Sequence, residues 1–387
     1  DADPDGLPVV TAHLVAAAIA NRTGIPIDHL TRQAGDGPPA LDIEAQLRDA
    51  VVGQEAAVAA VAATVRLSRL GLRPEERPRG IFLFGGPTGV GTTALARALA
   101  NAMTGSEASL LRIDLSEYQE AHSVSRLIGS PPGYVGYGDG GQLTKWLQRQ
   151  PASVVLLDEF EKAHPRVLDL FLQVFDAGRI TDGQGQTVDA RHAWFIMTTN
   201  LPVEDDLAEI KAAMRPEFLN RIDHVVRFDP LGLPQLLAIA EREIDVLRRR
   251  LGPRVHALRV EPLAMLAICQ DDAGGRAANG RTVLRNVESE ITHPLAVLLA
   301  SHAGNPPVVN VDPLGGGVSV TLAEGPEVAH LAPPPAFMPG APLPHPADTS
   351  SPDDEAYLHP YSDLEPDDSF DPDHFSPFEP DDEQPLF

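Results

Sequence analysis

The feature that most constrains this chain is a glycine-rich loop, Gly86-Pro-Thr-Gly-Val-Gly-Thr-Thr93, between an apolar run and a helical pattern. The run Ile81–Phe84 meets glycines at once, which is typical of a buried parallel strand, and a helix is predicted over Thr93–Met103. This is the setting of a phosphate-binding loop, whose pattern is GxxxxGK[ST]. Backbone N–H groups and the positive end of the helix would face the phosphates, and a plain structural turn is the less favoured alternative.

The lysine of that pattern is replaced by Thr92, whereas Thr93 keeps the hydroxyl that would bind Mg²⁺. A lysine makes charge-assisted hydrogen bonds to the phosphates worth ~1.5–3 kcal/mol each, so its loss is expected to weaken binding ~10- to 150-fold. The nearest cation along the predicted helix is Arg97, a little over one turn on, and we expect it to point elsewhere. Both a natural and an introduced substitution are compatible with the sequence.

Two acidic residues, Asp158 and Glu159, follow a second apolar run, Val154–Leu157. They are therefore expected at the carboxyl end of a parallel strand, where ligands of α/β proteins bind. Asp158 would hold the water shell of Mg²⁺, and Glu159 would orient or deprotonate the attacking water. Alone, the pair could equally be acids at the start of a helix; together with the loop it indicates nucleotide chemistry.

Further apolar runs extend this alternation of strands and helices, which predicts an α/β fold with a parallel sheet sandwiched by helices. The expected strands are Leu110–Ile113 and Trp194–Thr198, and the expected helices are Val10–Asn21 and Ile43–Leu70. After Pro230 the pattern predicts a smaller, mostly helical lid domain, with helices over Leu233–Leu251, Glu261–Cys269 and Thr282–Ala300 and a β element over Val308–Leu322. The expected divisions are a linker-like lead (1–40), a nucleotide-binding domain (41–231), the lid (232–325) and a tail (326–387).

Charge is distributed unevenly along the chain. The net charge is −25, and from Glu327 to Phe387 there are 15 acidic residues, 14 prolines and no lysine or arginine. That tail is expected to be disordered, either as a solvated extension or as a docking segment for a basic partner. A chain this acidic argues against nucleic-acid binding. No apolar run is long enough to predict a membrane span, and the single cysteine, Cys269, suits the cytoplasm.

The combination of segments is similar to the Clp family of AAA+ unfoldases, and most similar to the second ATPase domain of ClpB disaggregases. Even residues 23–26 resemble the linker between the two rings of those proteins. The resemblance spans residues 41–300 and rests on Val52-Gly53-Gln54, Arg112–Glu117, His122–Arg126, Gly133–Tyr137, Leu156–Pro165, Gly178–Asp189 and Arg215–Arg221.

This resemblance implies an AAA+ P-loop NTPase that uses ATP and Mg²⁺ within a hexameric ring, with ATP + H₂O giving ADP + phosphate. It implies catalytic roles for Glu159, for Asn200 as a polar sensor and for Arg221 as an arginine finger reaching into a neighbouring subunit. A gapless alignment on His293–Ala296 makes Arg281 the second sensor, whereas an alignment anchored on Gly280 would put Thr282 there. The implied nucleotide-binding residues are Val51, Val52, Gly86, Pro87, Thr88, Gly89, Val90, Gly91, Thr92, Thr93 and Asp158, with Thr93 and Asp158 holding the metal.

The resemblance also implies a mobile pore loop that grips unfolded or aggregated polypeptides, with Tyr134 as an amphipathic contact. Its residues are Gly133, Tyr134, Val135, Gly136 and Tyr137. The short connection between Asn200 and Arg215 lacks the tripeptide with which relatives dock a protease, so no protease partner is expected.

Three interpretations remain open from the sequence. The leading one is a ring-forming ATPase that remodels or threads proteins, with ATP binding and hydrolysis weakened by Thr92. The second is a non-hydrolysing structural subunit that lends Arg221 to active neighbours. The third is a fragment of a two-ring chaperone, which the first residue, Asp1, and the linker-like segment favour.

Overall fold

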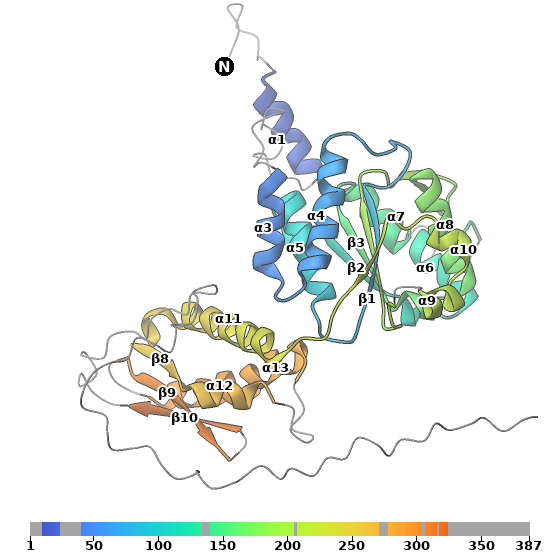
Figure 1. The fold of residues 1–387 in the computed structure, drawn as a ribbon. Helices are drawn as coiled ribbons and strands as arrows, with labels where there is room; N and C mark the ends of the chain where they lie inside the picture. The colour runs from blue at the N-terminus through green and yellow to red at the C-terminus, as the bar shows by residue number, and fades with distance from the viewer. Residues whose placement is uncertain are drawn as a thin grey trace, which may run out of the picture. The chain divides into compact units, whose positions relative to one another are not determined.

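The computed structural model describes residues 10–23, 40–133, 140–204, 207–270, 278–302, 306–315 and 317–323 (Figure 1). Contacts divide the chain into residues 1–326 and 327–387, and every described residue belongs to the first unit. Pore-loop residues Tyr134–Tyr137, most of the linker-like segment and the acidic tail lie outside the described ranges. None of the described helices combines the length and apolar character that crossing a bilayer requires.

A five-stranded parallel sheet forms the centre of the nucleotide-binding domain, as the sequence predicts. The strand order β2-β3-β6-β1-β7 places β1 between β6 and β7. Because all five strands run in the same direction, their carboxyl ends lie along one edge. The bounds are β1 Gly80–Gly85, β2 Leu110–Asp114, β3 Val154–Asp158, β6 Trp194–Thr199 and β7 His224–Arg227.

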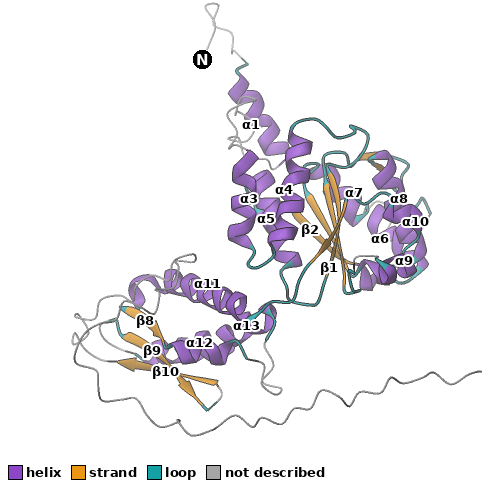
Figure 2. Cartoon of the chain, in the orientation of Figure 1, coloured by secondary structure: helices purple, strands orange, loops and turns teal. Residues whose placement is uncertain are grey.

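Helices cover both faces of this sheet (Figure 2). Successive side chains of β1 alternate between two hydrophobic clusters: Phe82 and Phe84 pack in one, and Ile81 and Leu83 in the other. The first cluster lies under α3 (Ala40–Ala50), α4 (Glu55–Arg69) and α5 (Thr92–Thr104). The second lies under α6 (Val124–Ile128), α7 (Gln142–Arg149), α8 (Pro165–Ala177), α9 (Ala208–Ala213) and α10 (Pro216–Leu219).

A third hydrophobic cluster organises the part of the chain after residue 230. Three strands in the order β10-β9-β8 form a second sheet, and a stretch of π-helix, Val287–Thr292, joins α13 to α14. The divisions at residues 40, 231 and 325 stay predictions. The elements are α11 Leu233–Leu251, β8 Ala257–Val260, α12 Pro262–Ile268, α13 Gly280–Asn286, α14 His293–Ser301, β9 Val308–Leu314 and β10 Gly317–Ala323.

The remaining elements are short. Helix α1 (Ala12–Thr23) agrees with the expected N-terminal helix, and β4 (Arg179–Thr181) pairs with β5 (Thr187–Asp189) in a hairpin. Short 3₁₀ helices are Glu107–Ser109, Leu115–Glu117, Ala121–Ser123, Phe160–Lys162 and Gly252–Arg254.

The helix expected over Ile43–Leu70 is two helices, α3 and α4. The break has a tertiary cause: Gly53 adopts a left-handed φ of 71°, and the Gln54 side chain donates to the carbonyls of Val90 and Asp229. The short strands β4, β5, β7 and β8 were not predicted from the sequence.

Candidate functional site

The glycine-rich loop connects β1 to α5, as expected. Gly91 is the N-cap of α5 with a φ of 112°, and no side chain caps the helix. The first-turn amides of α5 are therefore not satisfied by a side-chain cap, and the positive end of the helix dipole is directed at this loop. Such an end is suited to bind an anion.

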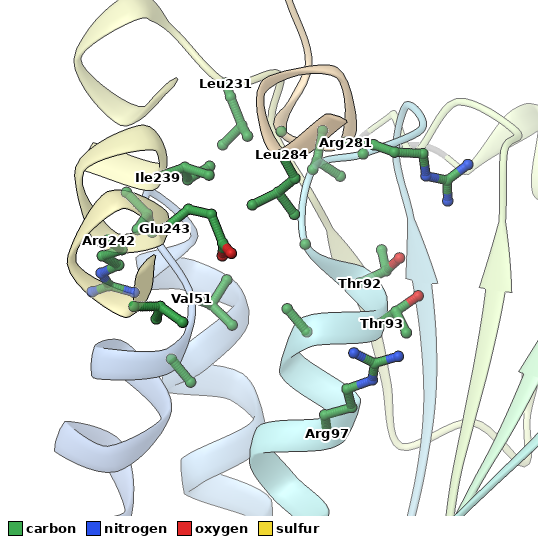
Figure 3. Close-up of a pocket in the computed structure, with 18 of the residues that line it drawn as sticks. Val51, Thr92, Thr93, Arg97, Leu231, Ile239, Arg242, Glu243, Arg281 and Leu284 are labelled. Atoms are coloured by element: carbon green, nitrogen blue, oxygen red, sulfur yellow. The ribbon is translucent and has the colours of Figure 1, made fainter. Parts of the chain in front are cut away.

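A cavity of about 480 Å³ lies against this loop and the start of α5. Figure 3 shows Thr92, Thr93 and Arg281 on one side of the loop. Apolar side chains lie on the other side, namely Val51, Leu231, Ile239 and Leu284. Val52 and Val90 also line the cavity. An apolar half beside a polar half suits a ligand with a flat base and a charged tail.

Arginine dominates the charge of the cavity. Four arginines and one carboxylate, Glu243, line it, in a chain whose net charge is −25. The arginines are Arg97, Arg112, Arg242 and Arg281. Because the rest of the chain is acidic, this local excess of cations favours a polyanionic ligand.

The expectation that Arg97 points elsewhere is wrong. Arg97 lines the cavity, and its guanidinium lies on the same side of α5 as Thr93 (Figure 3). Residues four apart lie on one face of a helix, and long side chains lean toward the helix N-terminus. Both effects bring Arg97 back to the loop.

The buried carboxylate of Asp158 is held at the end of β3 by two neighbouring strands. Its Oδ2 accepts from Arg112 Nε at 2.5 Å, and its Oδ1 accepts from the Thr198 hydroxyl at 2.9 Å. Arg112 lines the cavity and Asp158 does not, so the ion pair links the acid to one residue of the cavity wall. Neither Arg112 nor Thr198 was expected at the site from the sequence, although both lie in predicted strands.

Glu159 has backbone angles that few non-glycine residues adopt, with φ 53° and ψ 51°. Its N–H donates to the Thr198 hydroxyl, and its carboxylate accepts from Lys162 Nζ at 2.7 Å. That hydrogen bond raises the pKa of Lys162 above its ordinary value. Left-handed backbone at a non-glycine residue costs of order 1–3 kcal/mol and is concentrated at functional sites.

Asn200 and Arg221 are the other two residues of this domain that we expect to be catalytic, and each has different neighbours. Asn200 follows β6 directly, and its N–H donates to Glu161 Oε1 at 3.4 Å. Arg221 does not line the cavity; it forms an ion pair with Asp176 of α8, which raises the pKa of its guanidinium. The role of Arg221 toward a neighbouring subunit stays a prediction.

The lid contributes Arg281 through a backbone contact with the loop. Gly280 donates its N–H to the carbonyl of Gly89, and Arg281, next in α13, lines the cavity. Thr282, the alternative from the other alignment, instead donates through its N–H and hydroxyl to the side chain of Asn279. The geometry thus places Arg281 at the cavity and Thr282 at the helix cap.

Comparison with known proteins agrees with this architecture. Residues 77–225 match the AAA domain (Cdc48 subfamily). The chain is 45% identical over 316 residues to the chaperone protein ClpB of Corynebacterium efficiens, covering 80% of this chain and 36% of that protein. It is 46% identical over 297 residues to ClpB of Corynebacterium diphtheriae, covering 76% and 34%. It is 45% identical over 317 residues to ClpB 2 of Thermosynechococcus vestitus, covering 77% and 35%.

The chain thus spans about a third of the length of these relatives. The matched region contains most of the parallel sheet, the glycine-rich loop and the strand-end acids that the sequence predicts. The chain is a ClpB-like member of the Clp family of AAA+ proteins.

Proposed function

We propose that this chain binds ATP with Mg²⁺ in the cavity beside the glycine-rich loop and acts as a Clp-type ATPase subunit that remodels proteins. The observation that carries the proposal is the cavity itself. The N-terminus of α5, which has no side-chain cap, and four arginines line it together with an apolar wall. That wall is formed by Val51, Leu231, Ile239 and Leu284. The names of the relatives, which are chaperones, support the same class of activity.

The residues have distinct parts in this proposal. The α5 amides and the loop would bind the phosphates, and the apolar wall with Val52 would hold the base. Thr93 and Asp158 offer a hydroxyl and a carboxylate, which are the hard oxygen donors that Mg²⁺ prefers. When bound, the metal would neutralise phosphate charge. Glu159 would orient the attacking water once its carboxylate leaves Lys162, and Asn200 would help to place that water.

Ring assembly and substrate threading are parts of the proposal that rest on the family. Arg221 would leave Asp176 and approach the phosphates bound by a neighbouring subunit, where a guanidinium stabilises the transferring phosphoryl group. The segment Gly133–Tyr137 would contact polypeptide substrates. Its aromatic residues can bind many sequences, because a ring offers a flat apolar surface.

A second candidate function is a subunit that binds nucleotide without hydrolysing it. Thr92 favours this candidate, because a neutral hydroxyl replaces a charge, and the Glu159–Lys162 ion pair favours it as well. Because the chain matches about a third of its relatives, we also propose that it corresponds to one ATPase unit of a larger chaperone.

Calorimetry and phosphate release, measured on the chain and on Thr92→Lys, test the proposal. Thr92→Lys should raise ATP affinity ~10- to 150-fold through restored charge-assisted hydrogen bonds. In that background, Glu159→Gln should keep binding and abolish turnover. Unchanged affinity after Thr92→Lys would refute a phosphate site weakened at this position. Brisk turnover by the unaltered chain would instead refute the non-hydrolysing candidate.

A further inference from the structure

The loop lacks its lysine, yet the cavity is rich in cations. Arg97 is exposed and lies one turn beyond Thr93 in α5, the helix that begins at the loop. Four residues of helix rise roughly 6 Å, a distance that a long side chain leaning toward the N-terminus can span. Figure 3 shows the Arg97 guanidinium directed back toward Thr93.

The Arg97 guanidinium is also free to bind an added anion. It makes no hydrogen bond or ion pair to any residue that the structure describes. The positive end of the α5 dipole lies at the loop toward which this guanidinium is directed. An anion bound between the guanidinium and the first-turn amides would therefore accept hydrogen bonds from both.

The other arginines of the cavity are less suited to bind an anion at the start of α5. Arg112 already uses Nε on Asp158. Arg242 lies on α11, on the apolar side of the cavity (Figure 3). Arg281 belongs to the lid and depends on the contact of Gly280 with the loop. Of the four cavity arginines, only Arg97 lies in the same helix as Thr92 and Thr93.

We propose that Arg97 partly substitutes for the missing loop lysine and binds the terminal phosphates of the nucleotide. This inference rests on the proposed nucleotide site and adds the residue that compensates for Thr92. A guanidinium can bind phosphate oxygens with two parallel hydrogen bonds, which suits it to this replacement.

The experiment measures the affinities for ATP and AMP by calorimetry in four chains: the unaltered protein, Arg97→Gln, Thr92→Lys and the double variant. Arg97→Gln should weaken ATP binding about tenfold, the loss of one charge-assisted contact. AMP affinity should stay within about twofold, because AMP lacks the terminal phosphates. In the Thr92→Lys background, the same substitution should cost less than about threefold, because lysine supplies the contact.

Two further variants act as controls. Arg149→Gln removes an equivalent charge from the last turn of α7, at an exposed residue outside the cavity, and should leave ATP affinity unchanged. Arg97→Met keeps the aliphatic stem and should reproduce the loss if Arg97→Gln fails to fold.

The outcomes separate the inference from the proposed function. Unchanged ATP affinity in Arg97→Gln, or equal losses in both backgrounds, would overturn the inference. ATP binding by Thr92→Lys but not by the unaltered chain would also overturn it, while leaving the site intact. Failure of both proteins to bind ATP would instead refute the proposed function.

Discussion

Gly280 donates its backbone N–H to the carbonyl oxygen of Gly89 at 3.1 Å, which joins the first residue of α13 to the glycine-rich loop. Neither position has room for a side chain. A Cβ on Gly280 would lie 2.7 Å from the Gly89 carbonyl, and a Cβ on Gly89, whose φ is 79°, would meet Asn279. The close approach of two glycines therefore sets the position of Arg281 over the cavity.

Gly280→Ala should separate α13 from the loop and lower ATP affinity about tenfold. The added methyl meets a backbone atom, and overpacking of this kind costs about 1–3 kcal/mol, some of it as a weaker lid contact. Calorimetric titration with ATP measures the effect. Arg285→Ala, at an exposed residue of the same helix, is the control and should bind as the unaltered chain does. Equal affinities for Gly280→Ala and the unaltered chain would show that the lid contact does not support the site.

Arg112→Met should destabilise the chain by about 1–3 kcal/mol. The Asp158 carboxylate is buried at 7% exposure, and among the described residues the substitution leaves it with only the Thr198 hydroxyl as a partner. Urea unfolding measures the free-energy change. Adding Asp158→Asn should recover part of the loss, because an amide carries no charge to be desolvated. Independent, additive effects of the two substitutions would contradict a coupled pair.

Asp176→Asn should change the free energy of unfolding by less than about 1 kcal/mol. The Asp176–Arg221 pair is exposed, and exposed ion pairs contribute little stability because water screens them. Urea unfolding checks this expectation, with Asp169→Asn, which breaks the similarly exposed pair with Arg215, as the matched control. A loss of several kcal/mol would mean that Arg221 serves the fold, which is difficult to reconcile with a residue that moves to a neighbour.

Strands with continuous apolar runs were predictable from the sequence to within a residue or two. Ile81–Phe84 and Val154–Leu157 become β1 and β3, because both faces of the parallel sheet are covered and every position is apolar. Strand β7 was missed because it has only four residues, begins with His224 and lies at the sheet edge. Its pairing with β1 depends on residues far away in the sequence.

The site was predictable where spacing along the chain determines position, as for the loop and the strand-end acids. It was not predictable where packing between segments distant in the sequence determines the position of a side chain. The Arg112–Asp158 pair depends on the register of β2 against β3, and the direction of Arg97 depends on the space that its rotamer finds beside the loop. Helical periodicity gives the face of α5 on which Arg97 lies, but not the rotamer that it adopts.

The single cysteine provides a local probe of the lid. Cys269 is fully buried in the third hydrophobic cluster, and burial raises the pKa of its thiol from 9.0 to about 11. A thiolate is the reactive form, so native protein at pH 8 should react with a thiol reagent only as fast as the lid opens. Rapid labelling of the folded chain at pH 8 would contradict this burial.

The same shift makes stability depend on pH in a defined window. The folded state holds the thiol proton more tightly than the unfolded state does. The stability that this proton contributes to the fold is therefore complete below pH 9 and is lost as pH rises toward 11. Its upper limit is about 2–3 kcal/mol, two pKa units at 1.36 kcal/mol each. Urea unfolding of the chain and of Cys269→Ala, compared at pH 8 and pH 10, isolates the thiol, because other groups titrate equally in both. The stability difference between the two proteins should narrow at pH 10; a constant difference would mean that the thiol ionises as readily in the folded lid as in the unfolded chain.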